Sequence, residues 1–227
     1  MTQTVIPEPI RPTIPVKGGG VFPVRRVYCI GRNYAAHAIE MGHDPDREAP
    51  FFFQKNAENL DPSGTFPYPP MSADVHHEME MVVALKSGGR DIAQGDALNH
   101  VYGYGIGLDM TRRDLQGQMK KAGRPWEIGK AFERSAPVGA LSPVAAVGHP
   151  DHGRIALSVN GEVRQDADLN QMIWKVPEMI AYLSQYYDIA AGDVIMSGTP
   201  AGVGPVVRGD VMVGTIQGLG ELKVVVV

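Results

Sequence analysis

The chain has 227 residues, of which 44% are hydrophobic and 20% charged, a composition that supplies a packed core and excludes an intrinsically disordered protein. Its net charge of −4 offers no basic excess for a polyanion, so we expect no nucleic-acid partner. Nowhere do 18 apolar residues follow one another, so we expect no membrane-spanning helix and no membrane partner.

The N-terminal stretch is rich in proline and contains the run KGGG. We expect residues 1–25 to form an arm or small segment, and residues 26–227 to form a single catalytic domain. The stretch lacks the continuous apolar run of a signal peptide. Cys29 is the only cysteine, which excludes an intrachain disulfide and indicates a reducing compartment. We therefore expect a cytoplasmic protein.

Glycine and proline, 27 and 18 residues, divide the chain into short segments, which is typical of β-rich proteins. Strands are predicted at residues 26–31, 51–54, 78–86, 102–109, 155–160, 194–197, 211–216 and 222–227. Helices are predicted at residues 33–41, 112–121 and 177–187. Strands outnumber helices without a regular alternation, which argues against a doubly wound sheet or a β/α barrel. The sequence predicts a β-rich α+β fold, a mixed β-sandwich or roll with peripheral helices.

The first predicted helix, within GRNYAAHAIEM, places His37 and Glu40 three residues apart and so on one face. A carboxylate beside an imidazole fixes its tautomer and raises its basicity, which suits a water-activating general base. A solvent-exposed pair with no catalytic role is the alternative.

The run SADVHHEMEMVVALK places Glu78 and Glu80 two residues apart in a predicted strand. Successive side chains of a strand point to opposite faces, so the two glutamates share one face while Met79 and Met81 take the other. Neighbouring carboxylates repel each other. If their face is buried, a cation or a proton has to lie between them.

Asp109 ends the run VYGYGIGLDM, in which Gly103, Gly105 and Gly107 leave one face of a strand bare, so that another backbone or a ligand can approach. Together with the two glutamates, Asp109 would supply three hard oxygen donors of the kind that Mg²⁺ or Mn²⁺ binds. The alternative is a set of surface carboxylates on edge strands.

Basic residues outnumber acids in the segment 112–124, which can attract an anionic substrate or form a solvated helix face. Lys55 follows the apolar run PFFFQ, and Lys130 stands between a strand-like stretch and a turn with proline and glycine; both can be surface lysines. The glycine-rich turn SGTPAGVG at residues 197–204 offers backbone N–H groups to a carboxylate, but it lacks the Gly-Lys-Ser/Thr of a phosphate loop.

Seven motifs occur in order along the chain: GRNYAAHAIEM, FFFQKN, HHEMEMVV, GLDMTRRDLQ, GKAFERSAPVG, VNGEVRQD and SGTPAGVGPV. With them the chain resembles the fumarylacetoacetate hydrolase family, and within it the fumarylpyruvate and acylpyruvate hydrolases, over about residues 25–227. The resemblance implies a mixed β-sandwich roll, usually a homodimer, with Mg²⁺ or Mn²⁺ at its mouth and a mobile helical lid.

The resemblance also implies a role for each residue that matches a motif. The matching positions are Glu78, Glu80 and Asp109 for the metal, His37 with Glu40 for water activation, Lys130 as the active-site lysine, and Arg113, Gln116, Thr199 and Lys55 for the substrate. The chain departs from the family pattern after its two lysines. Asn56 stands where the family often has proline, and residues 131–133 read Ala-Phe-Glu where it often has Ser-Phe-Asp.

The implied activity is hydrolysis of the C3–C4 bond of a 2,4-diketo acid. Fumarylpyruvate is favoured over a short acylpyruvate, because its second carboxylate needs a second cationic contact that the segment 112–124 can supply. A decarboxylase or tautomerase acting on oxaloacetate or another 2-oxo diacid would use the same metal site without attack by water. A metal-stabilised module that binds carboxylates without turnover is the non-enzymatic alternative.

Overall fold

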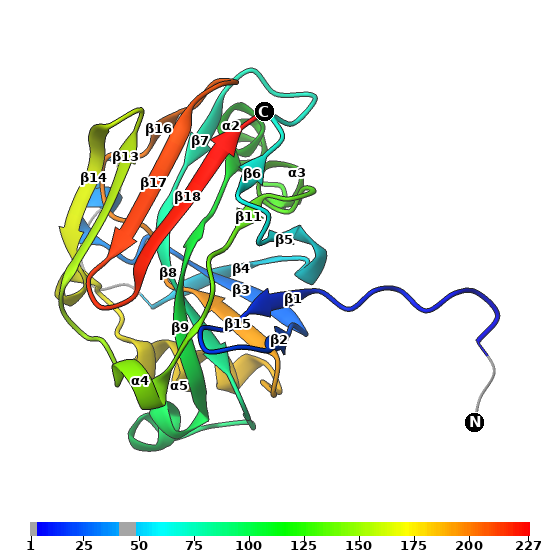
Figure 1. The fold of residues 1–227 in the computed structure, drawn as a ribbon, viewed down its shortest axis with the longest axis vertical. Helices are drawn as coiled ribbons and strands as arrows, with labels where there is room; N and C mark the ends of the chain where they lie inside the picture. Colours follow the sequence, from blue (N-terminus) through cyan, green and yellow to red (C-terminus); the bar gives the residue numbers. More distant parts are fainter. Residues whose placement is uncertain (1–3, 41–48) are drawn as a thin grey trace.

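A computed structural model describes residues 4–40 and 49–227 of the chain. Within these residues two mixed sheets face each other, with short helices around them (Figure 1). The larger sheet has six strands in the order β12 (Ser142–Pro143), β9 (Val101–Leu108), β8 (Met79–Leu85), β15 (Asp193–Met196), β3 (Arg26–Gly31) and β4 (Phe51–Lys55). The second has five in the order β14 (Glu162–Asp168), β13 (Arg154–Val159), β17 (Val211–Ile216), β18 (Gly220–Val226) and β6 (Thr65–Phe66).

Strand β8 lies inside the larger sheet and is buried along its whole length. The pleat sends Met81 and Val83 into the larger hydrophobic cluster, while Val82 and Ala84 join the smaller cluster on the other face. A strand covered on both faces needs apolar residues at successive positions, which explains the continuous apolar run of this strand. The same alternation places Glu80 on the face of Val82.

Strand β9 runs antiparallel to both β8 and β12 and carries Gly103, Gly105 and Gly107 at alternate positions. A Cβ atom at Gly103 would lie 2.5 Å from the carbonyl oxygen of Ser142, and one at Gly107 would lie 2.7 Å from a methyl group of Val82. The bare face of this strand therefore admits neighbouring protein groups, the backbone of β12 among them.

The second sheet packs its apolar face on the first. Leu157, Met212 and Val224 belong to the larger hydrophobic cluster together with the side chains of β8. At Gly214 a Cβ atom would lie 2.6 Å from the sulfur of Met79, so the two sheets approach closely at this point. The main core is the layer between the two sheets, and the architecture is a β-sandwich.

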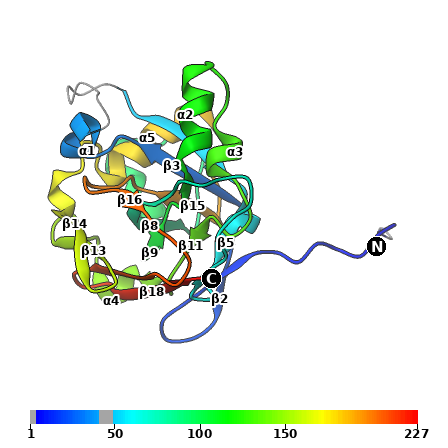
Figure 2. The ribbon, with the colours of Figure 1, turned by 90° about the horizontal axis from the view of Figure 1, so that it is seen from above.

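Helices lie at the edges and at one end of the sandwich. Helix α5 (Val176–Tyr186) buries Met179, Ile180 and Leu183 and has a proline in its first turn, where the missing N–H group does no harm. Helix α1 (Ala35–Glu40) lies apart from α2 (Arg113–Lys121) and α3 (Glu127–Lys130) in the view from above (Figure 2), and the candidate site described below lies between them. Among the described helices, none is both long and apolar enough to cross a membrane.

The remaining elements are short. They are α4 (Val144–Val147), β5 (Leu60–Asp61) paired with β11 (Ala136–Pro137), β7 (Val75–His77) between β10 (Thr111–Arg112) and β16 (Gly204–Pro205), and 3-10 turns at Ala57–Asn59, Gln94–His100 and Leu169–Gln171. At the N-terminal end, β1 (Thr13–Pro15) and β2 (Val21–Pro23) form a hairpin that buries Ile14 and Phe22. Residues 4–11 before it are exposed and run away from the body (Figure 1).

The predicted β-rich fold class is confirmed, and β3 and β17 span the predicted residues. Several elements were missed, mostly very short strands, and two of them, β14 and α3, contribute residues to the site described below. Strand β14 is mostly polar and exposed, and α3 is a four-residue helix, too short to show a helical period. The helix predicted at residues 33–41 begins later, at Ala35, and residue 41 lies outside the described residues.

Candidate active site

The pairing of β8 with β9 brings three carboxylates together. Met79 pairs with Leu108, so the residues beside them, Glu78 and Asp109, also face each other, and the N–H group of Asp109 donates a 2.8 Å hydrogen bond to the carbonyl oxygen of Glu78. Carboxylate oxygens of Glu78, Glu80 and Asp109 lie within 4.8 Å of one another, and all three side chains are buried. The alternative of surface carboxylates on edge strands is wrong.

Two buried lysines neutralise part of this charge. Lys130, at the end of α3, donates hydrogen bonds to Glu78 at 2.7 Å and to Asp109 at 2.8 Å, and a third to Thr111 at 2.7 Å. Lys55, at the end of β4, places its Nζ atom 2.9 Å from Oδ1 of Asp109. Each lysine is only 2% exposed, so neither is a surface residue.

Arg113 adds a third cation at the beginning of α2. Its guanidinium donates hydrogen bonds to Glu78 Oε1 at 2.5 Å and to Gln116 Oε1 at 2.7 Å. The second contact joins side chains three residues apart on one helix face. Together with Lys55 and Lys130, Arg113 balances the formal charge of the three carboxylates.

The balance is uneven within the cluster. Burial alone would raise the pKa of Glu78, but the charges of Lys130 and Arg113 outweigh burial and hold this pKa well below its usual value. Burial alone would lower the pKa of Lys130, but Asp109 and Glu78 outweigh burial and raise it. Burial, Asp109 and Glu78 all raise the pKa of Glu80, whose Oε2 accepts a hydrogen bond from the N–H group of Gly198. Glu80 is the carboxylate with the greatest need of a further cation.

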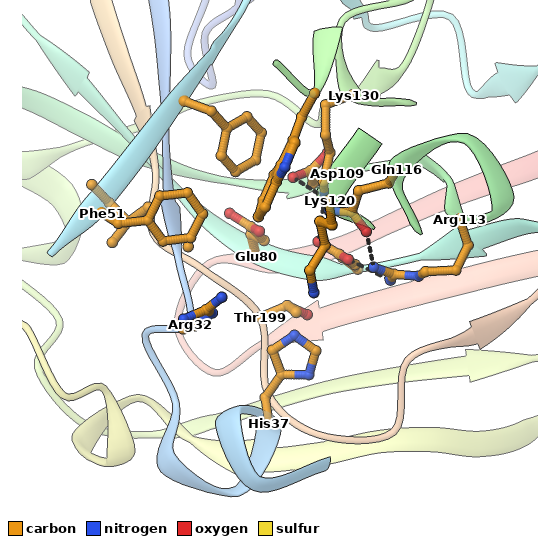
Figure 3. Close-up of a pocket in the computed structure, with 15 residues that line it drawn as sticks. Arg32, His37, Phe51, Glu80, Asp109, Arg113, Gln116, Lys120, Lys130 and Thr199 are labelled. Carbon is orange, nitrogen blue, oxygen red and sulfur yellow. Dashed lines mark hydrogen bonds and ion pairs between the residues drawn. The ribbon is translucent and has the colours of Figure 1, made fainter. Parts of the chain in front are cut away.

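Helix α1 carries the predicted dyad. His37 Nδ1 lies 3.1 Å from Glu40 Oε2, as the spacing predicts. Only 7% of His37 is exposed, and its imidazole points into the space beside Thr199 (Figure 3). Glu40 also accepts the N–H group of Gly202 at 3.1 Å. His37 is therefore buried and Glu40 is partly covered, so the pair is not freely exposed to solvent.

The turn SGTPAGVG lies beneath both groups. Its Gly198 has φ +91°, and a Cβ atom there would lie 2.7 Å from the Cβ of Asn33. Gly202 has φ +94°, and a Cβ atom there would lie 2.0 Å from the carbonyl oxygen of Arg164. Only glycine fits these two positions. The turn therefore aims one N–H group at Glu80 and another at the dyad.

Gln165 is a site residue that the sequence did not reveal. It is fully buried on β14, where its amide oxygen accepts hydrogen bonds from the N–H group of Met79 at 3.0 Å and from His77 at 3.2 Å. Burial lowers the pKa of His77 to about 4, so this ring is neutral near pH 7 and donates from Nδ1. The amide nitrogen of Gln165 donates to Thr199 Oγ1 at 2.8 Å. Gln165 thus ties the strand of the metal ligands to Thr199.

A cavity that is open to solvent lies between α1 on one side and α2 and α3 on the other. Its floor is the carboxylate cluster, and part of its wall is aromatic, from Phe51, Phe53 and Trp126. Arg32 and Lys120 also line it (Figure 3). Sequence reasoning placed Lys120 only within a basic segment and did not single out Arg32 or the aromatic residues.

The structure brings all the predicted site residues to this one place. Eight of them line the cavity: Glu78, Glu80, Asp109, His37, Lys130, Arg113, Gln116 and Thr199. Lys55 lies behind Asp109, and Glu40 lies behind His37. Phe132, which lies between the two departures from the family pattern at residues 131 and 133, packs under the ammonium of Lys55 at 5.6 Å from its ring centroid. The individual catalytic and binding roles stay predictions.

The cluster fits a divalent cation by its own chemistry. Its three donors are carboxylate oxygens, which suit Mg²⁺ or Mn²⁺. Oδ1 of Asp109 is buried and makes no hydrogen bond within the described residues, although the ammonium of Lys55 lies 2.9 Å away. Glu80, in contrast, has no ion-pair partner within the described residues, and its carboxylate oxygen lies within 4.8 Å of those of Glu78 and Asp109, so the three can share one cation.

The fold and the site define a class of proteins, β-sandwiches with a buried carboxylate site for a divalent cation beside a histidine–glutamate dyad. More particularly, the chain belongs to the fumarylacetoacetate hydrolase family, because the model of the fumarylacetoacetate (FAA) hydrolase C-terminal domain matches residues 26–227.

Relatives within the family differ in activity. The chain is 42% identical to the fumarylpyruvate hydrolase of a Ralstonia species over 82% of this chain and 98% of the relative. It is 40% identical to the oxaloacetate tautomerase of Escherichia coli K12 over 87% of this chain and 90% of the relative. The crystal structure of fumarylpyruvate hydrolase from Pseudomonas aeruginosa in complex with Mn²⁺ and pyruvate matches 99% of both chains, with a TM-score of 0.97 and 51% identity.

Proposed function

We propose that this protein is a divalent-metal-dependent hydrolase that cleaves the C3–C4 bond of a 2,4-diketo acid, with fumarylpyruvate as substrate and fumarate and pyruvate as products. One observation carries the proposal: His37, which is hydrogen-bonded to Glu40 behind it, lines the same cavity as the three carboxylates. A proton acceptor and a charge-stabilising site thus serve one substrate from two sides.

Glu78, Glu80 and Asp109 would hold Mg²⁺ or Mn²⁺, and the bound cation would act as a Lewis acid on the 2-oxo end of the substrate. Lys55, Lys130 and Arg113, the inner cations, already balance the formal charge of the three carboxylates. A divalent ion bound there would therefore give the site a net charge of two positive units. This net charge matches a 2-oxo acid that carries a carboxylate and develops a second negative charge during the reaction. Arg113 and Gln116, which line the cavity, would orient the substrate carboxylate.

His37 would take the proton from the attacking water. Because Nδ1 of His37 lies 3.1 Å from Glu40 Oε2, that nitrogen carries the hydrogen and donates it to the carboxylate. Nε2 then holds the free lone pair that a general base needs, and Glu40 stabilises the imidazolium formed when it accepts the proton. The water oxygen bonds to C4 as the C3–C4 bond breaks, and a proton is returned to C3.

Lys130 would stabilise the charge on the departing pyruvate fragment. Its ammonium is fixed by three acceptors, so it need not reorganise when negative charge develops nearby. The raised pKa of Lys130, set by Asp109 and Glu78 against the opposing effect of burial, keeps this group charged near neutral pH.

Oxaloacetate tautomerisation is a second candidate, which the 40% identity to an oxaloacetate tautomerase favours. That reaction moves a proton between carbon and oxygen without attack by water. A cation held by the same three carboxylates would stabilise its enolate as well. The two activities make different demands on His37, which hydrolysis needs to activate water.

A substrate panel tests the proposal. With Mg²⁺ present, we expect loss of the ultraviolet absorbance of fumarylpyruvate to be matched by an equal amount of pyruvate. The His37→Ala variant should lose hydrolysis by about 1,000-fold while retaining any tautomerisation of oxaloacetate. If wild-type protein leaves fumarylpyruvate intact but interconverts the keto and enol forms of oxaloacetate, the second candidate is correct.

We also propose a homodimer in the cytoplasm, as the family resemblance implies. Val5 and Ile10 support association, since these apolar side chains are 98% and 93% exposed on the segment before the hairpin. Light scattering of the purified protein would measure its mass, and a mass of one chain would contradict the dimer.

A further inference from the structure

Arg32 and Lys120 are two cations of the cavity wall that make no ion pair within the described residues. The inner cations Lys55, Lys130 and Arg113 all contact carboxylates of the floor. Among the described residues, no carboxylate lies within ion-pair distance of Arg32 or Lys120. As far as the structure describes the chain, these two positive charges face the cavity without a carboxylate partner.

The two cations come from different elements and face one space. Arg32 follows β3 with φ +57°, and Lys120 lies in the last turn of α2. Both side chains extend into the cavity in Figure 3. Burial lowers the pKa of Lys120, and the positive charges of Arg32 and Arg113 lower it further against the opposing effect of Glu78, so Lys120 lies within electrostatic range of both cations. An anion bound between Arg32 and Lys120 would relieve this repulsion.

Aromatic rings hold the two cations in place. The guanidinium of Arg32 lies 5.5 Å from the ring centroid of Phe51, and the ammonium of Lys120 lies 5.8 Å from that of Trp126. Phe51 and Trp126 contact each other edge to face at 5.1 Å. A Cβ atom at Gly31 would lie 1.9 Å from the ring of Phe51, so glycine at this position is required for the ring to lie there.

We propose that Arg32 and Lys120 form a subsite for a carboxylate at the far end of the acyl tail, and that the aromatic wall selects tails that are planar and conjugated. The inference rests on the proposed function and names the residues that select its substrate class. A flat, unsaturated chain would pass along the rings, while its terminal carboxylate would contact both cations. A neutral tail would leave the cations without an anion and would be a poorer substrate.

Hydrolysis of two matched substrates tests the subsite. The pair is fumarylpyruvate and its analogue with the far carboxylate replaced by a methyl ester. Arg32→Gln and Lys120→Gln should each lower kcat/KM for the acid by about tenfold and leave the ester within about twofold. Lys121→Gln, an exposed lysine next to Lys120, is the control and should change neither substrate. An equal loss for acid and ester would overturn the inference.

A binding measurement separates this inference from the proposed function. Calorimetry of the protein saturated with Mg²⁺ and pyruvate would compare fumarate with crotonate, which has a methyl group in place of one carboxylate. Wild type should bind fumarate at least about tenfold more tightly, and the double variant should lose the difference. Equal affinity in wild type would overturn the subsite even if hydrolysis proceeds. A preserved difference without hydrolysis would reject the proposed function alone.

Discussion

The backbone N–H group of Asp109 donates a 2.8 Å hydrogen bond to the carbonyl oxygen of Glu78. This bond continues the ladder of β8 and β9 beyond the last paired residues of the strands, Met79 and Leu108. The spacing of two of the three carboxylates is therefore set by backbone geometry, before any metal is bound. A site built on a sheet in this way is held more rigidly than one on a loop.

The Glu80→Gln variant should lose metal binding while keeping its fold. The amide oxygen of glutamine can still accept the N–H group of Gly198, but it carries no charge for the cation. We expect the rise in melting temperature on adding Mn²⁺ to disappear and pyruvate release to fall by at least about 100-fold. Glu221→Gln, an exposed glutamate on β18, should behave as wild type. Full activity of the Glu80 variant in chelator-treated buffer would refute the metal site.

Lys130→Met should destabilise the metal-free protein by about 3 kcal/mol, because it leaves Glu78 and Asp109 buried without their ammonium partner. Saturating Mn²⁺ should restore part of this loss, since a cation would again lie beside both carboxylates. Urea unfolding with and without the ion measures both values. Lys121→Met on the exposed helix end is the matched control, and an equal loss in the two conditions would contradict the shared role of lysine and metal.

Gln165→Leu should cost about 3 kcal/mol of unfolding free energy, because it leaves the buried partners of the amide, Thr199 and the N–H group of Met79 among them, without hydrogen bonds. Displacement of Thr199 should also raise KM for the diketo acid more than it lowers kcat. Thermal unfolding and steady-state kinetics check the two effects. The exposed Gln217→Leu serves for comparison, and a Gln165 variant with native stability and native KM would show that the bridge is dispensable.

Arg25→Met should destabilise the protein by about 2 kcal/mol at pH 8, because the fully buried Asp193 loses its ion pair at 2.9 Å. Burial already raises the pKa of Asp193, and removal of the arginine raises it further. A raised folded-state pKa means that the ionised form is disfavoured in the fold, so the penalty is present above this pKa and fades as pH falls through it. Urea unfolding should therefore show a smaller difference from wild type at pH 5 than at pH 8. A difference that grows on acidification would contradict the account.

The sequence predicted the fold class and the main strands because alternation and turn residues are local properties. It also predicted that Glu78 and Glu80 share a face, since both lie in one extended stretch. The site was foreseen mostly through the order of seven motifs, because contacts such as Lys55 with Asp109 depend on how β4 and β9 are placed in the sheets.

Other features have no local signal. Gln165 is the only fully buried position of a mostly polar strand, and its burial depends on what packs above it. Arg32 has a left-handed backbone conformation, with φ +57°, which the sequence Gly-Arg does not predict. The contact of Phe51 with Trp126 joins residues 75 positions apart in the chain, and nothing in either segment specifies it.

One short loop, residues 197–204, supports two pieces of chemistry at once. The N–H group of its first glycine, Gly198, donates to Glu80, and that of its second, Gly202, donates to Glu40, the partner of the proposed base. The separation between the His37–Glu40 dyad and the carboxylate cluster therefore depends on the short stretch from Gly198 to Gly202. Inserting or removing one residue in this loop would therefore displace the hydrogen-bond donor of Glu80 and that of Glu40 relative to each other, and a single change of length would disturb both side chains.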